Sequence, residues 1–590
     1  MKKPKISQVW KYEPSLNEFI YPENHESYND FFKHKQNFGI SFSGGGTRAA
    51  TCALGQLRGL DKIGVLNNAK YIASNSGGTW GSLPYIYYRG DLNNYFGEYF
   101  SPENLTIENV TEIPEKTFLH QMTEANILLE TLINRIIKKE RDESFSHAVA
   151  KIFLKPLKIP YVNKLFTLNE VSFEKLKSNN PEIKLNDFTQ VVDGRPFHIA
   201  NGTLHNWKFS KEGWNESRLG KDRLYHVEMT PLYAGVKVFH RGKGDHNTDI
   251  GGAYLDPFAF DSFFKRKIQK ENVELIEIEY RTDSSFKEKE FTLADIMGIS
   301  GSAATSADIS VDKLKLEKKS IMDKLVKFVK NIKYKLIKIP LFLYKGASYI
   351  TNSLPELHHF SPISATEENH GTIEYNVGDG GPVDDIALMP LLARGVPKIL
   401  CFCNVQYKIL KENNSNVFEF NENNFDDDVL CFFGLKKKNF PRGIESLEEQ
   451  ENFQQVFCKE DFWKLSEAFE QAMKSNKPLI YEGTHKVMHN PHFGIKGGNE
   501  VNIMWFYNER CKAWEEKIDT NIFEELKDEI GEKGFGKRLK NFPNFKTFGE
   551  NAFKIIEMHP SQATLLSNYQ TWIIDENKEK IQAFLSMGND

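Results

Sequence analysis

Short apolar runs followed by helical patterns organise residues 39–100. The run Ile40–Phe42 comes before a glycine-rich turn, after which apolar residues recur at near-helical spacing as far as Leu66. A second run, Tyr71–Ala73, comes before another glycine turn and a further helical pattern. This order of strand, turn and helix, repeated twice, predicts an α/β fold whose central mixed sheet is mainly parallel.

The pattern changes along the rest of the chain and suggests how it is organised. Residues 1–37 are polar and aromatic without a period, which predicts an N-terminal arm over a main domain of residues 38–590. Residues 102–200 are rich in lysine and glutamate and read as a helical cap insertion. The Asn- and Asp-rich stretch 413–428 reads as a surface loop, with cation binding as the less favoured alternative.

A second insertion, at about 311–353, has a basic amphipathic pattern. A helix of this kind can lie in a lipid interface as a lid, although a helix packed on the core with a solvated lysine face remains the alternative. Lysines stand at 313, 315, 318, 319, 324, 327, 330, 333, 335, 338 and 345, and apolar residues at 321, 325, 328, 332, 336 and 339.

Composition narrows the class of protein. The chain has 590 residues, 40% of them hydrophobic and 26% charged, with a net charge of −4, which argues against nucleic-acid binding through overall charge. The six cysteines include no C-x-x-C pair, so we expect a reducing compartment. No secretory signal and no apolar run of about 20 residues is seen, so we expect a cytoplasmic protein, soluble or peripheral to a membrane.

The two glycine turns carry the candidate chemistry. In Ser74-Asn-Ser-Gly-Gly-Thr-Trp80, Ser76 follows an apolar run and precedes two glycines and a helical pattern, which is the setting of a nucleophile elbow. The usual elbow has glycine two residues before the nucleophile, where this chain has Ser74. A plain tight turn is the alternative interpretation of Ser76.

The first turn, Ser43-Gly-Gly-Gly-Thr-Arg48, predicts an oxyanion hole. Gly44, Gly45 and Gly46 lie at a strand–helix junction and can direct N–H groups outward, and Gly77 follows the predicted nucleophile. Arg48 begins the next helix, and its planar guanidinium suits a phosphate, whereas a surface ion pair is the alternative.

A base for the serine is predicted in a third glycine turn. Val377-Gly-Asp-Gly-Gly381 places Asp379 after a strand with glycine on both sides. Asp384 and Asp385 are rivals, but they open the next helix and suit its dipole.

Three alternatives to this site remain open. Histidines follow Asp379, so a Ser–Asp–His triad is available, and their spacing also allows a zinc site, although an Asn-Pro break lies within it. Ser300, in Gly298-Ile-Ser-Gly-Ser302, resembles an elbow but follows a helical pattern rather than a strand. The histidines concerned are His485, His489, His492 and His559.

With these motifs in hand, the chain resembles the catalytic domain of group IV cytosolic phospholipase A2 and fungal lysophospholipase (phospholipase B), and more distantly patatin. The matching blocks run in the family's order across roughly residues 38–590. They begin at Ser43, Ser76, Val227, Met297, Asp379, Arg394 and Asn541.

The resemblance implies a three-layer α/β fold and a Ser76–Asp379 dyad without histidine. It also implies oxyanion donors at Gly45 and Gly46 and substrate binding by Arg48 and Arg394. We expect no cofactor and no metal. The family's calcium-binding C2 domain is not expected, because residues 1–37 alone precede the first motif.

The function expected from these features is a phospholipase A or lysophospholipase at a membrane phospholipid surface. The enzyme would hydrolyse acyl esters of glycerophospholipids through an acyl-enzyme. One alternative is an acyltransferase or an esterase for a non-phospholipid ester, and another is a catalytically inactive lipid-binding protein.

Overall fold

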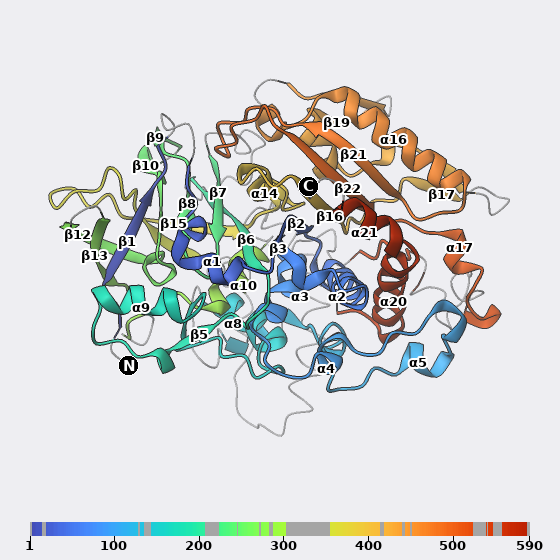
Figure 1. The fold of residues 1–590 in the computed structure, drawn as a ribbon, viewed down its shortest axis with the longest axis horizontal. Helices are drawn as coiled ribbons and strands as arrows, with labels where there is room; N and C mark the ends of the chain where they lie inside the picture. Colours follow the sequence, from blue (N-terminus) through green and yellow to red (C-terminus); the bar gives the residue numbers. More distant parts are fainter. Residues whose placement is uncertain are drawn as a thin grey trace, which may run out of the picture.

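The structure is a computed structural model, shown as a ribbon in Figure 1. It describes residues 3–13, 19–127, 130, 131, 133, 134, 143–206, 223–244, 246–270, 273–282, 287–302, 355–412, 418–438, 443–448, 451–522, 539, 541–546 and 557–586. The predicted basic insertion at about 311–353 lies outside the described residues.

A large mixed sheet forms the centre of the molecule, with 14 strands among the described residues. Its middle is parallel, since β3 pairs in parallel with β6 and β2, and β16 pairs in parallel with β2 and β22. These five strands are β6 (Phe197–His205), β3 (Ala69–Ser74), β2 (Gln36–Phe42), β16 (Lys398–Cys403) and β22 (Glu500–Tyr507). They are almost wholly buried, as expected for strands covered on both faces.

On both sides of the parallel strands the pairing becomes antiparallel. The antiparallel strands are β7 (Leu224–Met229), β8 (Ala234–Val236), β11 (Ala253–Leu255), β1 (Ile6–Lys11), β13 (Val273–Tyr280), β12 (Ser262–Lys270), β14 (Glu356–His359), β15 (Ile373–Asp379) and β21 (Ile480–Lys486). The predicted α/β fold with a mixed sheet is therefore confirmed, and its parallel part contains the strands that the first two glycine turns follow.

Short strand pairs and helices complete the described fold. The pairs are β4 (Leu165–Thr167) with β5 (Phe188–Gln190), β9 (His240–Lys243) with β10 (Thr248–Ile250), β17 (Leu410–Glu412) with β18 (Phe418–Phe420), and β19 (Leu435–Lys438) with β20 (Gly443–Ser446). The helices not discussed below are α1 (Asn29–Phe32), α4 (Leu92–Phe96), α5 (Ile107–Thr111), α6 (Phe118–Gln121), α9 (Glu170–Asn179), α17 (Lys512–Glu515) and α21 (Lys578–Ser586).

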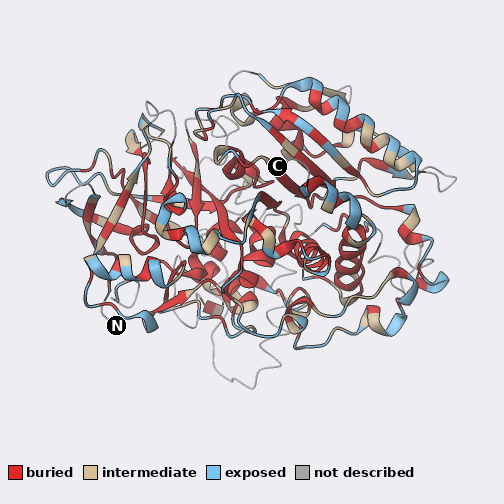
Figure 2. Ribbon diagram, in the orientation of Figure 1, coloured by how far each residue is buried: buried red, intermediate tan, exposed pale blue. Residues whose placement is uncertain are grey.

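Helices α2 (Gly46–Lys62), α3 (Ser76–Tyr87) and α20 (Pro560–Glu576) pack together beside the central strands (Figure 1). The close approach of α2 and α20 needs Gly55, where a β-carbon would lie 2.3 Å from the carbonyl oxygen of Ser567. Helix α16 (Lys459–Lys474) packs against β21, and Figure 2 shows its outer side exposed.

Residues 1–37 do more than cover the core. Strand β1 lies inside the sheet between β13 and β11, so the predicted N-terminal arm contributes a structural strand. Its pairing partners come from residues 253–280, and the local pattern of β1 does not reveal them.

Part of the predicted cap at 102–200 also belongs to the core. In α8 (Ser144–Phe153), Phe153 stacks on Trp80 of α3 with ring centroids 5.3 Å apart. Trp80 is fully buried and donates a hydrogen bond to the carbonyl of Met297 in α10 (Leu293–Ser300). This part of the insertion therefore supports the helix that follows the second glycine turn.

Candidate active site

Ser76 lies at a sharp turn between β3 and α3. Its φ is +47°, a left-handed conformation that a residue with a β-carbon adopts at a cost. The strain is supported locally, because the Ser76 N–H donates to the Oγ of Ser300 at 3.0 Å. A strained serine between a strand and a helix is the geometry of a nucleophile elbow.

Ser74 does not prevent this turn. Its Oγ lies 2.9 Å from Thr79 Oγ1 and 2.9 Å from Nε2 of His198, and Thr79 Oγ1 lies 2.8 Å from Ser300 Oγ. All four side chains are buried. Burial lowers the pKa of His198 to about 3, so this ring is neutral. The hydroxyl that replaces glycine therefore enters a hydrogen-bond network beneath the elbow.

Ser300 belongs to that network and is fully buried in the last turn of α10. Its Oγ contacts the backbone of Ser76 and the side chain of Thr79. It does not line the cleft described below. The structure therefore places Ser300 behind this turn, where it binds the backbone of Ser76 and does not face the cleft.

Asp379 is the last residue of β15 and contacts the elbow directly. Its Oδ1 accepts hydrogen bonds from the Gly381 N–H at 3.0 Å and from Nδ2 of Asn75 at 2.9 Å. Burial raises the pKa of Asp379 to about 6, and the nearby Ser76 side chain and the donors of Gly381 and Asn75 lower it by smaller amounts. The structure thus brings together two residues that lie 303 positions apart.

The first glycine turn faces the same site, with one correction to the sequence analysis. The N–H of Gly44 donates to the backbone carbonyl of Asp385 at 2.8 Å, so it is not available as an oxyanion donor. Gly46 and Gly77 occupy the first turns of α2 and α3, where N–H groups have no intrahelical partner. Two helix N-termini therefore meet at Ser76.

Gly45 and Gly77 are required by the backbone itself. Gly45 has φ +127°, and a β-carbon on it would lie 2.0 Å from Nη2 of Arg48. A β-carbon on Gly77 would lie 2.0 Å from the carbonyl oxygen of Gly46. The two turns consequently approach each other more closely than any side chain allows.

A cleft of about 210 Å³ opens beside Ser76. This is less than the roughly 300–1,000 Å³ that encloses a drug-sized ligand, so the cleft has room for only one end of a larger molecule. Its lining residues are Gly45, Gly46, Arg48, Ser76, Asp379, Gly381, Pro382, Asp385, Val405, Gln406, Tyr407, Asp426 and Asp428.

Arg48 lines this cleft and is almost fully buried, which excludes the surface ion pair that the sequence left open. Its Nε donates to the carbonyl of Asn404 at 3.0 Å and its Nη1 to the carbonyl of Phe545 at 2.9 Å. The remaining nitrogen, Nη2, lies against Gly45. The guanidinium is therefore held in place with one nitrogen beside the first glycine turn.

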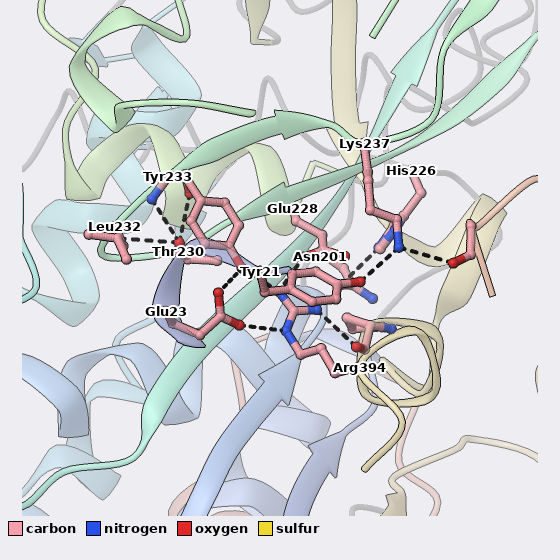
Figure 3. Close-up of polar contacts among 12 residues, drawn as sticks. Tyr21, Glu23, Asn201, His226, Glu228, Thr230, Leu232, Tyr233, Lys237 and Arg394 are labelled. Carbon is pink, nitrogen blue, oxygen red and sulfur yellow. Dashed lines mark hydrogen bonds and ion pairs between the residues drawn. The ribbon is translucent and has the colours of Figure 1, made fainter. Parts of the chain in front are cut away.

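Arg394, the second predicted substrate-binding arginine, has a different position. It ends α14 (Met389–Ala393) and is buried, with Nε 2.9 Å from Glu23 Oε1 and Nη2 2.7 Å from Glu228 Oε2 (Figure 3). It does not line the cleft. The structure therefore does not bring Arg394 to the cleft, because two carboxylates from elements far away in the sequence already bind its guanidinium.

The cleft is also lined by acidic residues that the sequence analysis did not assign to the site. Asp426, the N-cap of α15 (Asp427–Leu430), and Asp428 come from the stretch predicted as a surface loop. Asp385 was interpreted as a helix-opening acid, yet it also lines the cleft. Burial and the neighbouring carboxylates raise the pKa of Asp385. The Asp-rich run at 426–428 is the one local signal for this cluster.

Asp384 has a purely structural partner set. Its carboxylate accepts N–H groups of Leu388 and Met389, at the start of α14, and Asp384 itself is the last residue of α13 (Gly381–Asp384). This agrees with the prediction of an acid that serves a helix N-terminus.

None of the described histidines lines the cleft. His485 is buried at β21, where its ring contacts Asp461 at 3.1 Å and accepts from Trp505 at 3.1 Å. His489 contacts the carbonyl of Lys496, and His559 caps α20. Within the described ranges there is also no group of three or more His, Cys, Asp or Glu residues suited to a metal ion.

Comparisons with known proteins add a remote structural likeness. No protein-family model matches the chain, and no curated protein matches it in sequence. Human GIVD cytosolic phospholipase A2 is similar with a TM-score of 0.41 and 11% identity over 97% of this chain. The same human protein in complex with methyl gamma-linolenyl fluorophosphonate gives a TM-score of 0.39 and 12% identity over 94%. The chain spans 64% and 59% of the lengths of these two structures.

Proposed function

We propose that this protein is a serine acyl-hydrolase of the phospholipase A or lysophospholipase type. The observation that carries the proposal is Ser76, held at φ +47° in a strand–helix turn beside the buried carboxyl group of Asp379. Both residues line one cleft, beside the first glycine turn. A nucleophile, a base and oxyanion donors are the three parts that acyl transfer requires.

The reaction proceeds in two steps. Asp379 takes the proton of Ser76 as Oγ attacks the ester carbonyl, and N–H groups of Gly46 and Gly77 stabilise the oxyanion. The C–O ester bond breaks, and the protonated Asp379 gives its proton to the leaving alcohol. Asp379 then takes a proton from water as the water attacks the acyl-serine, the bond between the acyl carbon and Oγ breaks, and Asp379 returns the proton to Oγ as the fatty acid leaves.

Arg48 supports a phospholipid as the substrate. Its guanidinium lines the same cleft as Ser76, and hydrogen bonds to two backbone carbonyls fix the orientation of the guanidinium. A guanidinium in a fixed orientation binds a phosphate oxygen better than it binds a neutral ester. The small cleft accommodates the ester end, so the acyl chains extend outside it.

The proposed site of action is a membrane phospholipid surface on the cytoplasmic side, with peripheral attachment. The basic amphipathic pattern at about 311–353 supports contact with an anionic bilayer. Within the described ranges, no helix has the length and apolarity needed to cross a membrane.

The function is tested by lipidomics of liposomes incubated with wild type, Ser76→Ala and the control Ser178→Ala, an exposed serine on α9. We expect free fatty acid and lysophospholipid from wild type and the control, and none from Ser76→Ala. Acyl transfer to an acceptor lipid without fatty acid release would identify an acyltransferase instead. Lipid binding without any turnover would identify an inactive lipid-binding protein.

A second variant tests the substrate class. Arg48→Met should lower kcat/KM for a phospholipid by about 10-fold to 100-fold, the value of one or two charge-assisted hydrogen bonds. Hydrolysis of a neutral p-nitrophenyl ester by the same variant should stay near wild type. Equal losses on both esters would show that Arg48 only maintains the fold of the cleft.

A further inference from the structure

Asn75 is the residue between β3 and Ser76, and its side chain is fully buried. Its Nδ2 donates to Oδ1 of Asp379 at 2.9 Å and to Oδ1 of Asp385 at 2.8 Å. Its Oδ1 accepts the N–H of Gly380 at 3.0 Å. One carboxamide therefore connects the elbow with two carboxyl groups and with the turn that carries Asp379.

The chemistry of these partners fixes the orientation of the amide. Carboxylate oxygens accept hydrogen bonds and the Gly380 N–H donates one, so the NH₂ group must face Asp379 and Asp385. Rotation by 180° would place the amide oxygen against two carboxyl oxygens. Both N–H hydrogens of Asn75 are thus used, one for each carboxyl group.

The two carboxyl groups lie close together at the reacting end of the cleft. Asp385 Oδ1 would be 2.2 Å from a β-carbon on Gly44, and the same β-carbon would be 3.0 Å from Cβ of Ser76. Burial raises the pKa of both Asp379 and Asp385, and for Asp385 the charge of Asp379 raises it further. Hydrogen bonds from Asn75 act in the opposite direction on both groups.

We propose that Asn75 is a positioning residue of the acyl-transfer reaction, whose carboxamide holds the Asp379 carboxylate against Ser76 and separates it from Asp385. The inference rests on the proposed function of Ser76 and Asp379. Asn75 does not line the cleft, so it acts through Asp379 rather than on the substrate. A neutral donor between two acids favours the ionised form of the base that must accept the proton.

Other charges also face this pair. Asp426 and Asp428 come from the α15 segment and Arg48 from α2, and Asp385 interacts with all three. All three side chains are kept in an Asn75 variant, in which Asp379 and Asp385 lose the hydrogen bonds from the amide. A change in the pH profile of an Asn75 variant therefore reports the loss of the amide itself.

The test compares Asn75→Leu and Asn75→Asp with the matched control Asn201→Leu. Asn201 is also a fully buried amide, but it donates to Asp384 at 3.1 Å rather than to Asp379. Both Asn75 variants should lower kcat by about 100-fold, as expected for a misplaced catalytic group, with little change in KM. The acid limb of the kcat–pH profile should move to higher pH in both, and further in Asn75→Asp, whose added carboxyl disfavours ionisation of Asp379.

The control should lose thermal stability and keep the wild-type acid limb. Asn75→Asp preserves the size of the side chain, so it carries the test if Asn75→Leu does not fold. A folded Asn75 variant with wild-type kcat and an unmoved acid limb would overturn the inference, as would an equal shift in Asn201→Leu. Absence of hydrolysis by wild type would instead overturn the proposed function.

Discussion

The molecule contains two groups of buried acidic residues, which differ in their charged partners and in the direction of their pKa shifts. In the Figure 3 cluster, Glu23 and Glu228 both contact the guanidinium of Arg394. Burial raises the pKa of Glu228, but the charge and hydrogen bond of Arg394, together with nearby His226 and Lys237, outweigh burial and leave that pKa below its ordinary value. In the cleft, burial raises the pKa of Asp379 and of Asp385, and the charge of Arg48 lowers the pKa of Asp385 only as a smaller effect.

The difference separates a structural cluster from a candidate reactive one. Charged groups that are buried with matched partners hold elements together, whereas buried acids without matched charge keep a pKa suited to proton transfer. The first cluster connects residues near the N-terminus with α14, and the second lies where two helix N-termini meet. The following predictions test this contrast, from the largest effect to the smallest.

The largest effect is expected for the proposed nucleophile and base. Ser76→Ala and Asp379→Asn should each lower kcat/KM by at least about 10⁴-fold, because each removes a group that takes part in bond formation or proton transfer. Esterase assays on purified protein measure the loss, with thermal unfolding as the control for folding. Substantial activity in folded Asp379→Asn would show that another base serves Ser76.

The Arg394 cluster should respond in the opposite way. Arg394→Met leaves two carboxylates buried without a cation and should lower the free energy of unfolding by about 3–5 kcal/mol. Activity per folded molecule should stay near wild type, since Arg394 does not line the cleft. Denaturant unfolding together with active-site titration measures both. A variant of full stability but altered KM would return Arg394 to the substrate-binding role.

The acid limb of activity should reveal the raised pKa of Asp379. The base must be ionised to accept a proton. On acidification, kcat should therefore begin to fall at a pH well above about 4, the pKa of an ordinary aspartate. The pH dependence of kcat between pH 4 and 9 measures this. A rate that stays constant down to pH 4.5 would contradict uncompensated burial of Asp379.

The smallest effect concerns Lys237, a buried lysine beside the Arg394 cluster. Burial, aided by Arg394, lowers its pKa to about 7, and its Nζ donates to Tyr21 Oη at 2.7 Å. Because the folded pKa lies below the unfolded one, the unfolded chain binds more protons between about pH 7 and 10. Stability should therefore rise with pH across that window in wild type and less so in Lys237→Met, as measured by chemical unfolding at several pH values.

Local patterns were sufficient to predict the residues that the turns carry. Ser76 and Asp379 each follow an apolar run and have glycine neighbours, and these features depend only on nearby residues. The α/β class and the mixed sheet followed from the same alternation. The structure brings Ser76 and Asp379 together, although no pattern states that two turns 303 positions apart meet.

The errors share a physical cause, which is pairing over long sequence separations. Arg394 donates hydrogen bonds to Glu23 and Glu228, which precede it by more than 160 positions. The N–H of Gly44 donates to the carbonyl of Asp385, and strand β1 pairs with β11 and β13. Such partners depend on which elements lie side by side, and no local period encodes that.

The most direct test of the account is covalent labelling with a fluorophosphonate, followed by mass spectrometry of the peptides. A fluorophosphonate reacts with a serine whose hydroxyl is activated by a base and faces oxyanion donors. We predict one adduct, on Ser76, that is lost in Asp379→Asn. An adduct on Ser300, or hydrolysis of phospholipid without any adduct on Ser76, would contradict the account.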